Sequence, residues 1–572
     1  MSDKRTELNQ LIAELRQERE SYIPHWKDIN QFVRPRSAKF VIESGNRGAK
    51  RNQNIINNTA TLASESLASG MMSGVTSPAR PWFKLSTGDP ALDKVDSVKQ
   101  WLHEVAEAMR DVFGKSNLYT ELPLVYADLG DYGISALAAL EDDEQIVHFQ
   151  HFPIGSYSIA TDAKGRVCGI VREWQMTVRQ LVDEFGKEAC SAQVQAMYDN
   201  HQMGAWIEVA HLVLKNRDYR PGSLRAKHKR YLSIYMERSG NGRPESSITG
   251  FLRESGFDEF PVMCPRWSVT GEDPYGNSPG MNALGDVKAL QLLEKRAAQM
   301  IDKGANPPMA APGSLRNQRA SLLPGDVTYV DVNQGQQGFV PVYEPNPNWL
   351  GGLEGKIQQH EARIRRAYFE DLFLMLSNLE GVQPRNQLEI AERKEEKLLQ
   401  LGPVMDRLND ELFDRMIDRT FAIMVKRSLP DWDAGMPGLL PPPPQEVQDA
   451  NLKVEYTSIM AQAMKKVALG DIERFAGFIG NIAQGDPSVL DRWNLDETAK
   501  EYHDGIGLAP KIIRTDEEVQ AIREQRAQAQ QAAQQMEMAK AGSEAMRNVG
   551  QVPLDGDNAL ARIIQNMEGA AA

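Results

Sequence analysis

A Gly-x-Ser-x-Gly pattern at residues 276–280 is the sequence feature closest to a catalytic motif, with Ser278 in the position of a nucleophile. In hydrolases that carry this motif, the backbone N–H of the residue after the serine helps to bind the oxyanion. Here that residue is Pro279, which has no N–H to donate. The same residues fit the start of a helix, because a polar cap followed by proline suits the first helical turn. We therefore predict a helix cap and keep a hydrolase that uses Ser278 only as a hypothesis for testing.

Two groups of side chains could in principle bind a metal ion. His148 and His151 lie in a predicted strand or turn without a plausible third ligand, so structural histidines are the favoured interpretation. The four carboxylates of residues 141–144 lie on a predicted turn. A solvated surface is the favoured interpretation of these carboxylates, and a weak site for a divalent ion is the alternative.

Other signatures of catalysis are absent from the sequence. It has no Walker A phosphate loop, no HExxH zinc motif, no kinase-type metal motif and no dinucleotide-binding glycine pattern. The three cysteines, Cys168, Cys190 and Cys264, lie far apart without a CxxC spacing. This spacing predicts buried free thiols rather than a disulfide framework or a zinc site. We therefore expect a protein that is not an enzyme and that has no cofactor.

Length, charge and hydropathy narrow the class of protein further. The chain has 572 residues, of which 41% are hydrophobic and 25% charged, as is typical of a soluble protein with several domains. Its net charge of −13 argues against a protein that clamps nucleic-acid phosphates, but it allows a surface past which nucleic acid slides. The N-terminus lacks the apolar core of a signal peptide, and no run approaches the roughly 18 apolar residues of a membrane span. We expect an aqueous, reducing compartment without membrane contact.

The elements that follow Ser278 predict a protruding arm. A helix over Pro279–Lys303 carries apolar residues at steps of three and four and ends at Gly304. A proline-rich excursion with strand character follows over Ala305–Trp349, and a second amphipathic helix returns over residues 351–376. Two rods joined at the far end by a small β excursion form an arm rather than a catalytic pocket.

The remaining elements predict an α+β fold that is mainly helical. Residues 4–33 form a predicted helix that Pro24 kinks or restarts, and an α+β body reaches to about Trp267. The predicted strands cover residues 145–152, 156–160, 167–174, 206–214, 230–236 and 452–456, with a helix over residues 178–185. Four consecutive prolines at residues 441–444 predict a stiff spacer and a domain boundary.

The last predicted helix, residues 515–547, has an apolar stripe that is little more than alanine. Such a stripe buries little apolar area by itself, and burial is worth about 25 cal/mol per Å². Two interpretations stay open: a frayed polar tail, or a helix whose copies pack side by side in an oligomer.

Five short segments, spread over nearly the whole chain, carry a family resemblance. They are Trp26–Arg36, Ser73–Phe83, Pro274–Pro279, Asn306–Pro308 and Val454–Ser458, and the Gln- and Ala-rich last helix belongs with them. Together they resemble the head-to-tail connecting (portal) proteins of short-tailed, T7-like bacteriophages. No single segment is diagnostic, but the combination is specific.

The resemblance implies a portal fold with a wing, a two-helix stem, a small β clip and a C-terminal helical crown or barrel. By residue number it places the wing at 1–270, the first stem helix at 271–303, the clip at 304–350 and the second stem helix at 351–376. A channel-facing tunnel loop follows at 377–385, and a long wing helix with the proline-rich spacer covers 386–445. The crown or barrel covers 446–548, and a disordered tail covers 549–572.

The resemblance also implies an assembly. Twelve copies would form a ring at one capsid vertex, around a channel for the packaging and ejection of double-stranded DNA. The implied partners are the terminase large subunit, the major capsid and scaffolding proteins, and tail adaptor or tail tube proteins. The implied location is the virion, after synthesis in the host bacterial cytoplasm. The alternative is another virion structural protein, such as a tail adaptor or an internal head protein.

Three sets of residues are the candidate sites. The tunnel loop would present Asn378, Glu380, Gln383 and Arg385 to DNA in the channel, with Arg385 as the phosphate contact. The stem would present Lys295, Arg296, Arg363 and Arg366, and the clip would dock partners through Gln334, Gln336, Gln337 and Tyr343.

Overall fold

The computed structural model describes residues 2–40, 52–89, 91–223, 225–238, 250–311, 313, 316, 321, 339–342, 347–377, 401–436, 438–447, 453–456, 475–482, 493–506, 514 and 516–549. The chain divides into two compact units, Met1–Leu490 and Asp491–Ala572. Helices and strands alternate in the first unit, and helices make up the described part of the second. This mixture confirms the predicted α+β class with its excess of helix.

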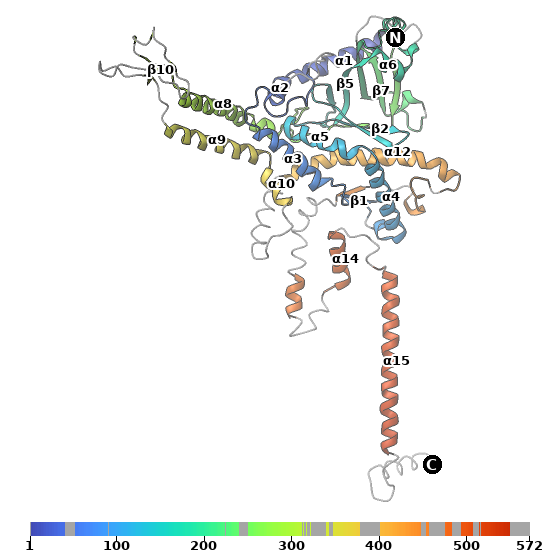
Figure 1. The fold of residues 1–572 in the computed structure, drawn as a ribbon. Coiled ribbons are helices and arrows are strands. Elements are labelled where there is room, and N and C mark those ends of the chain that lie inside the picture. Colours follow the sequence, from blue (N-terminus) through green and yellow to red (C-terminus); the bar gives the residue numbers. More distant parts are fainter. Residues whose placement is uncertain are drawn as a thin grey trace, which may run out of the picture. The chain divides into compact units, whose positions relative to one another are not determined.

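An antiparallel five-stranded sheet forms one side of the first unit (Figure 1). In spatial order its strands are β4 (Tyr157–Thr161), β5 (Val167–Thr177), β6 (Trp206–Lys215), β7 (Tyr231–Glu237) and β8 (Arg253–Phe257). Helix α1 (Ser2–Glu20) packs its apolar stripe on one face, where Leu8 and Ile12 meet Leu212. The helices α6 (Val178–Phe185) and α7 (Ala192–Asp199) cover apolar residues of the other face. Burial on both faces explains why these strands alternate so weakly in hydropathy.

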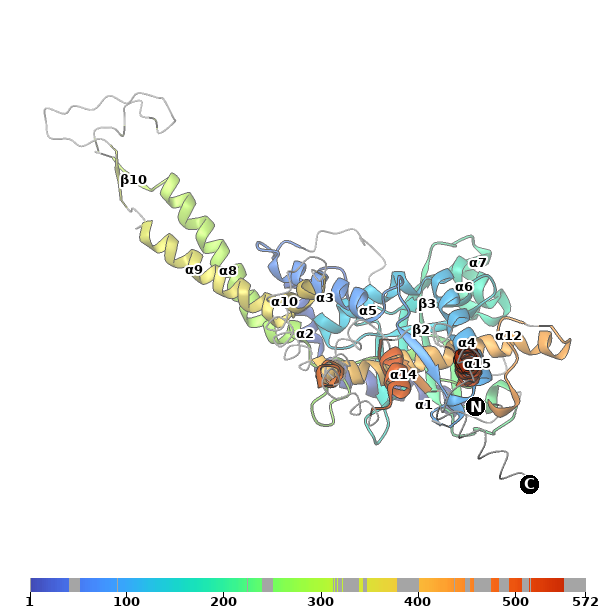
Figure 2. The same ribbon diagram turned by 90° about the horizontal axis from the view of Figure 1, so that it is seen from below.

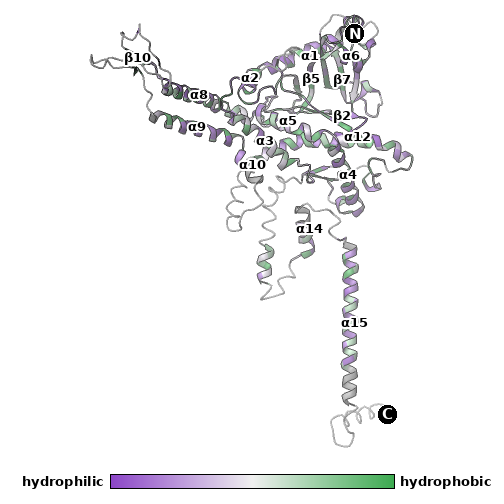
Figure 3. Cartoon of the chain, in the orientation of Figure 1, coloured by the Kyte–Doolittle hydropathy of each residue, from purple (hydrophilic) through white to green (hydrophobic). Residues whose placement is uncertain are grey.

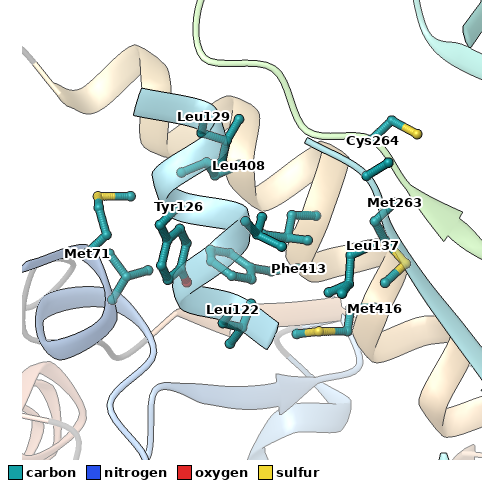
Figure 4. Close-up of a cluster of buried hydrophobic side chains, with 14 of the residues drawn as sticks. Met71, Leu122, Tyr126, Leu129, Leu137, Met263, Cys264, Leu408, Phe413 and Met416 are labelled. Carbon is teal, nitrogen blue, oxygen red and sulfur yellow. The ribbon is translucent and has the colours of Figure 1, made fainter. Parts of the chain in front are cut away.

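A second group of elements forms the main core around a three-stranded sheet with the order β3-β2-β9. The strands are β2 (Leu137–Asp142), β3 (Ile146–His151) and β9 (Val262–Met263), and the helices are α2 (Ile23–Phe32), α3 (Thr59–Val75), α4 (Asp96–Lys115), α5 (Leu118–Tyr132) and α12 (Asp414–Asp433). Figure 4 shows Leu122 and Tyr126 of α5 against Phe413, which precedes α12. Short 3-10 turns lie at Leu92–Lys94 and Gln445–Val447, and two more, at Lys187–Ala189 and Ala226–His228, belong to the region of the five-stranded sheet.

A two-helix arm projects from this core, as Figures 1 and 2 show from two directions. It consists of α8 (Pro279–Ala305) and the antiparallel α9 (Pro347–Ala367), and its outer end carries the short paired strands β10 (Met309–Ala310) and β11 (Val340–Pro341). The predicted rods and the β excursion between them are therefore present. Residues 322–338 of the predicted excursion lie outside the described residues.

The return helix is divided, whereas the sequence predicted one helix over residues 351–376. Helix α9 ends at Ala367, and α10 (Glu370–Ser377) starts after a turn in which Phe369 has a φ of 57°. Burial accounts for the break: Tyr368 is fully buried, and the Phe373 ring packs where any side chain at Gly70 of α3 would lie. A straight helix could not bring both rings to the core.

The proline-rich segment packs on the body and does not separate two domains. Trp432 and Trp101 donate indole N–H bonds to the carbonyls of Leu440 and Pro441, at 2.8 and 3.0 Å. After it, strand β12 (Lys453–Tyr456) pairs with β1 (Phe83–Ser86). The first unit continues to Leu490, and the predicted crown or barrel at residues 446–548 stays a prediction. The prolines stiffen this segment without detaching it, because two tryptophans hold its carbonyls.

The second unit contains α14 (Leu495–Ile506) and the 34-residue helix α15 (Asp516–Val549). Arg523 of α15 forms an ion pair with Asp496 of α14 at 2.7 Å. Beyond Ile522, all the described side chains of α15 are exposed. Figure 3 shows purple and pale segments alternating along α15, with no green stripe along its length. None of the helices in the described ranges is both long and apolar enough to cross a membrane.

The base of the arm as the candidate functional site

Ser278 caps helix α8 and connects it to the body. Its hydroxyl oxygen accepts a hydrogen bond from the Met281 N–H at 2.9 Å and donates one to the backbone oxygen of Asp131 at 2.6 Å. The side chain is buried, and Pro279 takes the first helical position. Both bonds join the serine to main chain, and no histidine takes part in them. The predicted cap is confirmed, and this arrangement gives Ser278 no general base.

Two glycines allow the backbone to close at this point. Gly133 ends α5 with a φ of 78°, a conformation that disfavours other residues. A Cβ atom on Gly276 would lie 2.3 Å from the Gly133 oxygen, so only glycine fits. The Gly133 oxygen in turn accepts the Trp267 N–H at 2.9 Å. The Gly-x-Ser-x-Gly pattern is thus a close junction between α5 and the start of the arm.

Three side chains from distant parts of the sequence meet at the carboxylate of Asp131. Ser64 of α3 donates to its Oδ2 at 2.9 Å, and Tyr368 at the end of α9 donates to its Oδ1 at 3.0 Å. The Arg34 Nε lies 3.1 Å from Oδ2 in an ion pair. Since Ser278 binds the backbone oxygen of the same residue, Asp131 contacts the first helix of the arm and the end of the second.

A second carboxylate extends this network toward β3. Asp128, one helical turn before Asp131, forms an ion pair with Arg34 and accepts or donates a 2.7 Å bond with the Nε2 of His151. The His151 backbone N–H donates to Glu121 at 3.1 Å. The cluster therefore holds two carboxylates against one guanidinium and one imidazole, which is a buried excess of negative charge when the imidazole is neutral.

Burial perturbs the ionisation of this cluster. Removal from water raises the pKa of Asp131 to about 6, although the Arg34 charge and the bonds from Ser64 and Tyr368 act in the opposite direction. Burial and the neighbouring Asp131 charge raise the pKa of Tyr368 well above its usual value. Burial alone would lower the pKa of Arg34, but the charges of Asp128 and Asp131 raise it. At neutral pH Tyr368 is therefore the donor and the Asp131 carboxylate is the acceptor.

A second buried ion pair stabilises the segment that leads into the arm. Glu411 accepts from the Arg266 backbone N–H at 2.9 Å and pairs with its guanidinium, with Nη2 at 2.5 Å from Oε1. Arg266 also donates to the Pro274 and Gly165 carbonyls at 3.2 and 2.8 Å. A π-helical turn at Asn409–Phe413 places Glu411 there. Such turns frequently occur at functional sites.

The two arm helices together hold the segment that precedes α3. The Asn57 side chain donates to Glu294 of α8 at 2.8 Å and to Glu361 of α9 at 2.9 Å. The buried Gln291 accepts the Ile56 and Asn57 N–H groups at 2.7 and 2.9 Å. This contact lies farther along the arm than Asp131, so the arm is tied to the body at two levels.

Sequence reasoning missed most of this network. Asp128, Asp131, His151 and Glu411 are spaced without a motif, and their partners lie up to 237 residues away. Two of the segments that resemble the family did point to this network. Trp26–Arg36 contains Arg34, and Pro274–Pro279 contains Tyr275 and Ser278. The Tyr275 and Trp26 rings meet edge to face at 5.2 Å. Two of the segments that carry the resemblance therefore contribute residues to the junction.

The predicted stem residues lie on the solvent side of the arm. Lys295, Arg296, Arg363 and Arg366 are all exposed. Arg296 donates to Gln299 at 3.1 Å, and Arg363 lies 3.5 Å from Asp286. The structure does not bring the four into one cluster with a common partner. The predicted tunnel-loop residues Asn378, Glu380, Gln383 and Arg385 and the clip residues Gln334, Gln336, Gln337 and Tyr343 lie outside the described residues.

The two candidate metal-binding groups have other contacts. His151 is bonded to Asp128, and His148 is an odd number of positions away on β3, so it lies on the opposite face. The carboxylates of residues 141–144 meet cations of α12: Lys426 pairs with Glu141 at 2.9 Å and Arg427 with Asp143 at 3.3 Å. Within the described ranges, no three His, Cys, Asp or Glu side chains are grouped as metal ligands.

Comparison with known proteins gives the context for this geometry. The family model described as bacteriophage head to tail connecting protein matches residues 5–513. The portal protein of Salmonella phage epsilon15 is 45% identical over 98% of this chain and 97% of its own length. The probable portal protein of Bordetella phage BPP-1 is 41% identical over 97% of each chain.

A solved structure titled "Neck of empty GTA particle computed with C6 symmetry" also matches 74% of this chain and 86% of its own. The two chains are 12% identical, and the TM-score is 0.35.

Proposed function

This chain belongs to the family of bacteriophage head-to-tail connecting, or portal, proteins, and from that premise we propose that copies of it form a ring around a channel for double-stranded DNA. The ring has twelve subunits, sits at one capsid vertex and is a structural part of the virion rather than an enzyme. The number twelve and the vertex come from the resemblance to the family.

The observation that carries the proposal is the arm. Helices α8 and α9 extend from the body with exposed polar and charged side chains on much of their surface, including Lys295 and Arg363. Leu292 and Ile301 of α8 are exposed as well, 55% and 58%. Exposed apolar residues on a long amphipathic rod suit packing between neighbouring rods, with the charged residues facing a channel.

The C-terminal helix gives independent support. A single helix of 34 residues with exposed side chains has little to stabilise it in water, since most helical stability in proteins comes from packing. Met536 and Met538 are 71% and 74% exposed on it. Neighbouring copies would cover these side chains, which favours the oligomeric interpretation over a frayed tail.

The net negative charge of the chain suits a protein that surrounds a channel for moving DNA. DNA that moves over long distances must not be held at each phosphate, and a net charge of −13 gives a mostly repulsive wall. We propose that Arg385, with Asn378, Glu380 and Gln383, contacts DNA at the tunnel loop, and that Lys295, Arg296, Arg363 and Arg366 line the stem. The clip residues Gln334, Gln336, Gln337 and Tyr343 would dock the terminase large subunit and later the tail proteins.

Electron microscopy of the purified protein tests the central proposal. We expect end-on views of rings with a central hole and twelvefold symmetry. A monomer in solution, without rings in the images, would overturn the proposal and favour a tail adaptor or an internal head protein.

A deletion of Asn378–Val382 tests the channel loop. Rings should assemble as before, while DNA packaging or retention in infected cells falls. A matched five-residue deletion in the exposed body turn at residues 219–223 controls for the loss of chain length. Normal packaging with the first deletion would remove the tunnel loop from the proposal.

A deletion of Asn333–Gly338 tests the clip. We expect normal rings that fail to dock the packaging motor or the tail, because the docking side chains are lost. Tail attachment at the normal level would contradict the assignment.

A further inference from the structure

An arginine on the five-stranded sheet, far along the chain from the arm, has a free hydrogen-bonding edge and no counter-charge. We propose that Arg172 of β5 is the centre of a binding site for a carboxylate group, on the face of the sheet away from α1. The site lies within one subunit, so the proposal does not depend on whether the subunits form a ring.

Arg172 belongs to a row of side chains that crosses this face. It pairs in register with His211 of β6, and His211 pairs with Tyr235 of β7. Arg253 of β8 lies at the end of the row, beside Tyr235. The neighbouring Val171 packs with α1, and side chains alternate along a strand, so the row lies on the opposite face.

The row carries one positive charge that nothing in the described chain balances. Arg253 is paired with Glu184 at 3.0 Å. Burial and the charges of Arg172 and Arg253 lower the pKa of His211 to about 3, so the imidazole is neutral at neutral pH. Burial raises the pKa of Tyr235, so its hydroxyl is neutral as well. Arg172 is therefore the charge without a partner.

The guanidinium of Arg172 has one edge without an acceptor. Its Nη1 donates to the uncharged amide oxygen of Gln150 at 3.0 Å. Among the described residues, Nε and Nη2 have no hydrogen-bond acceptor, and Nε is buried. The ring centroids of Phe152 and Trp174 lie 4.0 and 4.6 Å from Cζ, which leaves the edge of Nε and Nη2 as the approach. Arg172 is partly exposed, so a ligand reaches this edge from the Nη2 end.

Other arginines in the interior have stronger acceptors. Arg34, Arg266 and Arg419 each face a carboxylate. Arg19 donates to two backbone oxygens, at 3.0 and 2.9 Å. By contrast, burial lowers the pKa of Arg172 to about 10, and no carboxylate among its described neighbours opposes the shift. A charge that is partly removed from water without a counter-charge is costly, and a bound carboxylate would offset that cost.

The shape and charge of the free edge favour a carboxylate over a phosphate group. Nε–H and Nη2–H point in parallel, which is the arrangement that binds both oxygens of a planar carboxylate. A phosphate group carries nearly two charges at neutral pH and three acceptor oxygens. One unbalanced guanidinium matches the single charge of a carboxylate, because the other arginine of the row is already paired.

Titration of the full-length protein with sodium acetate tests the site. The Trp174 ring lies against Arg172, so its fluorescence should report binding, and sodium chloride at matched ionic strength is the reference. We expect a saturable fluorescence change with acetate that chloride does not give. A wild-type protein that responds equally to the two salts would overturn the proposal. A saturable response to sodium phosphate without one to acetate would overturn the assignment of a carboxylate.

Two substitutions assign the response to Arg172. Arg172→Met keeps the apolar stem and removes the charge, so acetate affinity should fall about tenfold or more, the loss that one charge-assisted hydrogen bond represents. Arg172→Lys keeps the charge but loses the two-donor edge, and its affinity should lie between those of Arg172→Met and wild type. Circular dichroism shows whether each variant is folded, and the lysine variant keeps the test decisive if the methionine variant is not.

A matched control separates this site from a general effect of charge. Arg166→Met removes an exposed arginine that is paired with Asp162 in the same hairpin, and it should bind acetate as the wild type does. Unchanged acetate affinity in the folded Arg172 variants, or an equal loss in Arg166→Met, would overturn the proposal.

Discussion

The base of the arm and the C-terminal helix α15 differ in how far their side chains are buried and paired within the chain. At the base, charged groups are buried and nearly every one has a partner within the same chain, as Asp131 and Glu411 show. Along α15 beyond Ile522, the described side chains are exposed, and its apolar residues, such as Met536, meet solvent. The junction therefore has its partners within one subunit, whereas in the proposed ring the long helix would pack against other copies.

The largest effect should come from the buried ion pair at the base. Glu411→Ala leaves Arg266 buried without its carboxylate, and we expect a loss of about 3–5 kcal/mol in the free energy of unfolding. Chemical denaturation of the purified protein measures it. Asp496→Ala breaks the exposed pair with Arg523 in the second unit and is the control, for which we expect no measurable change. An equal loss of unfolding free energy from the two substitutions would contradict the difference between the buried base of the arm and the exposed helix.

The pH dependence of stability should also come from the base. Asp131 holds its proton more tightly in the folded chain, with a pKa of about 6 against an ordinary value of 3.8. The stability it contributes is therefore present below about pH 4 and is lost as the pH rises through 6, by at most about 3 kcal/mol.

Denaturation curves between pH 4 and 8 measure this slope, and Asp131→Asn should reduce it. Part of the slope should remain in that variant, because burial and the neighbouring Asp414 and Glu259 charges raise the pKa of Asp418 to about 6 as well. An identical slope in the variant would show that Asp131 does not titrate in this range.

The close backbone junction predicts a smaller loss. Gly276→Ala places a methyl group 2.3 Å from the Gly133 oxygen, so the two backbone segments must separate. We expect a cost of about 2 kcal/mol, together with faster hydrogen exchange at the Trp267 amide, which is bonded to Gly133. Gly285→Ala is the matched control, since nothing lies within 4 Å of a Cβ atom at that helical position. It should be neutral or stabilising.

Much of the local structure followed from the sequence. Helix α6 has the predicted bounds, because Thr177 and Gln180 form a capping box and the apolar residues repeat at helical spacing. The restart at Pro24, the arm and four strands of the five-stranded sheet, β4 to β7, were predicted for the same reason, that their signals are periodic and short in range. Strand β8 was not predicted.

The junction could not be predicted, because its contacts are long in range. Tyr368 and Asp131 are 237 positions apart, and neither lies in a motif. The break at Phe369 also has no local signal, since tertiary packing of Phe373 against Gly70 overrides a regular helical pattern. The predicted tunnel loop and clip residues remain predictions.

The cap of α8 gives a modest effect that also tests the remaining enzymatic hypothesis. Ser278→Ala removes the bonds to Met281 and to the Asp131 backbone, and we expect a loss of about 1 kcal/mol in stability. Denaturation measures this loss, and an ester hydrolysis assay on the same samples should show no activity in either protein. Hydrolysis by the wild type that the substitution abolishes would restore Ser278 as a nucleophile.

The smallest effect on the subunit, and the largest on assembly, is expected at α15. The double substitution Met536→Glu and Met538→Glu places charges on exposed positions, so the unfolding free energy of the isolated chain should change by no more than about 0.5 kcal/mol. In a ring these side chains would lie between neighbours, and buried unpaired carboxylates there would strongly disfavour assembly. Mass photometry of the variant should therefore show fewer rings than wild type, while Gln534→Glu on the same helix serves as a milder control. An unchanged number of rings would mean that α15 is a polar tail that does not pack between copies. The contrast between the junction at Asp131, which is stabilised within one chain, and a helix that is stabilised by neighbouring chains would then not hold.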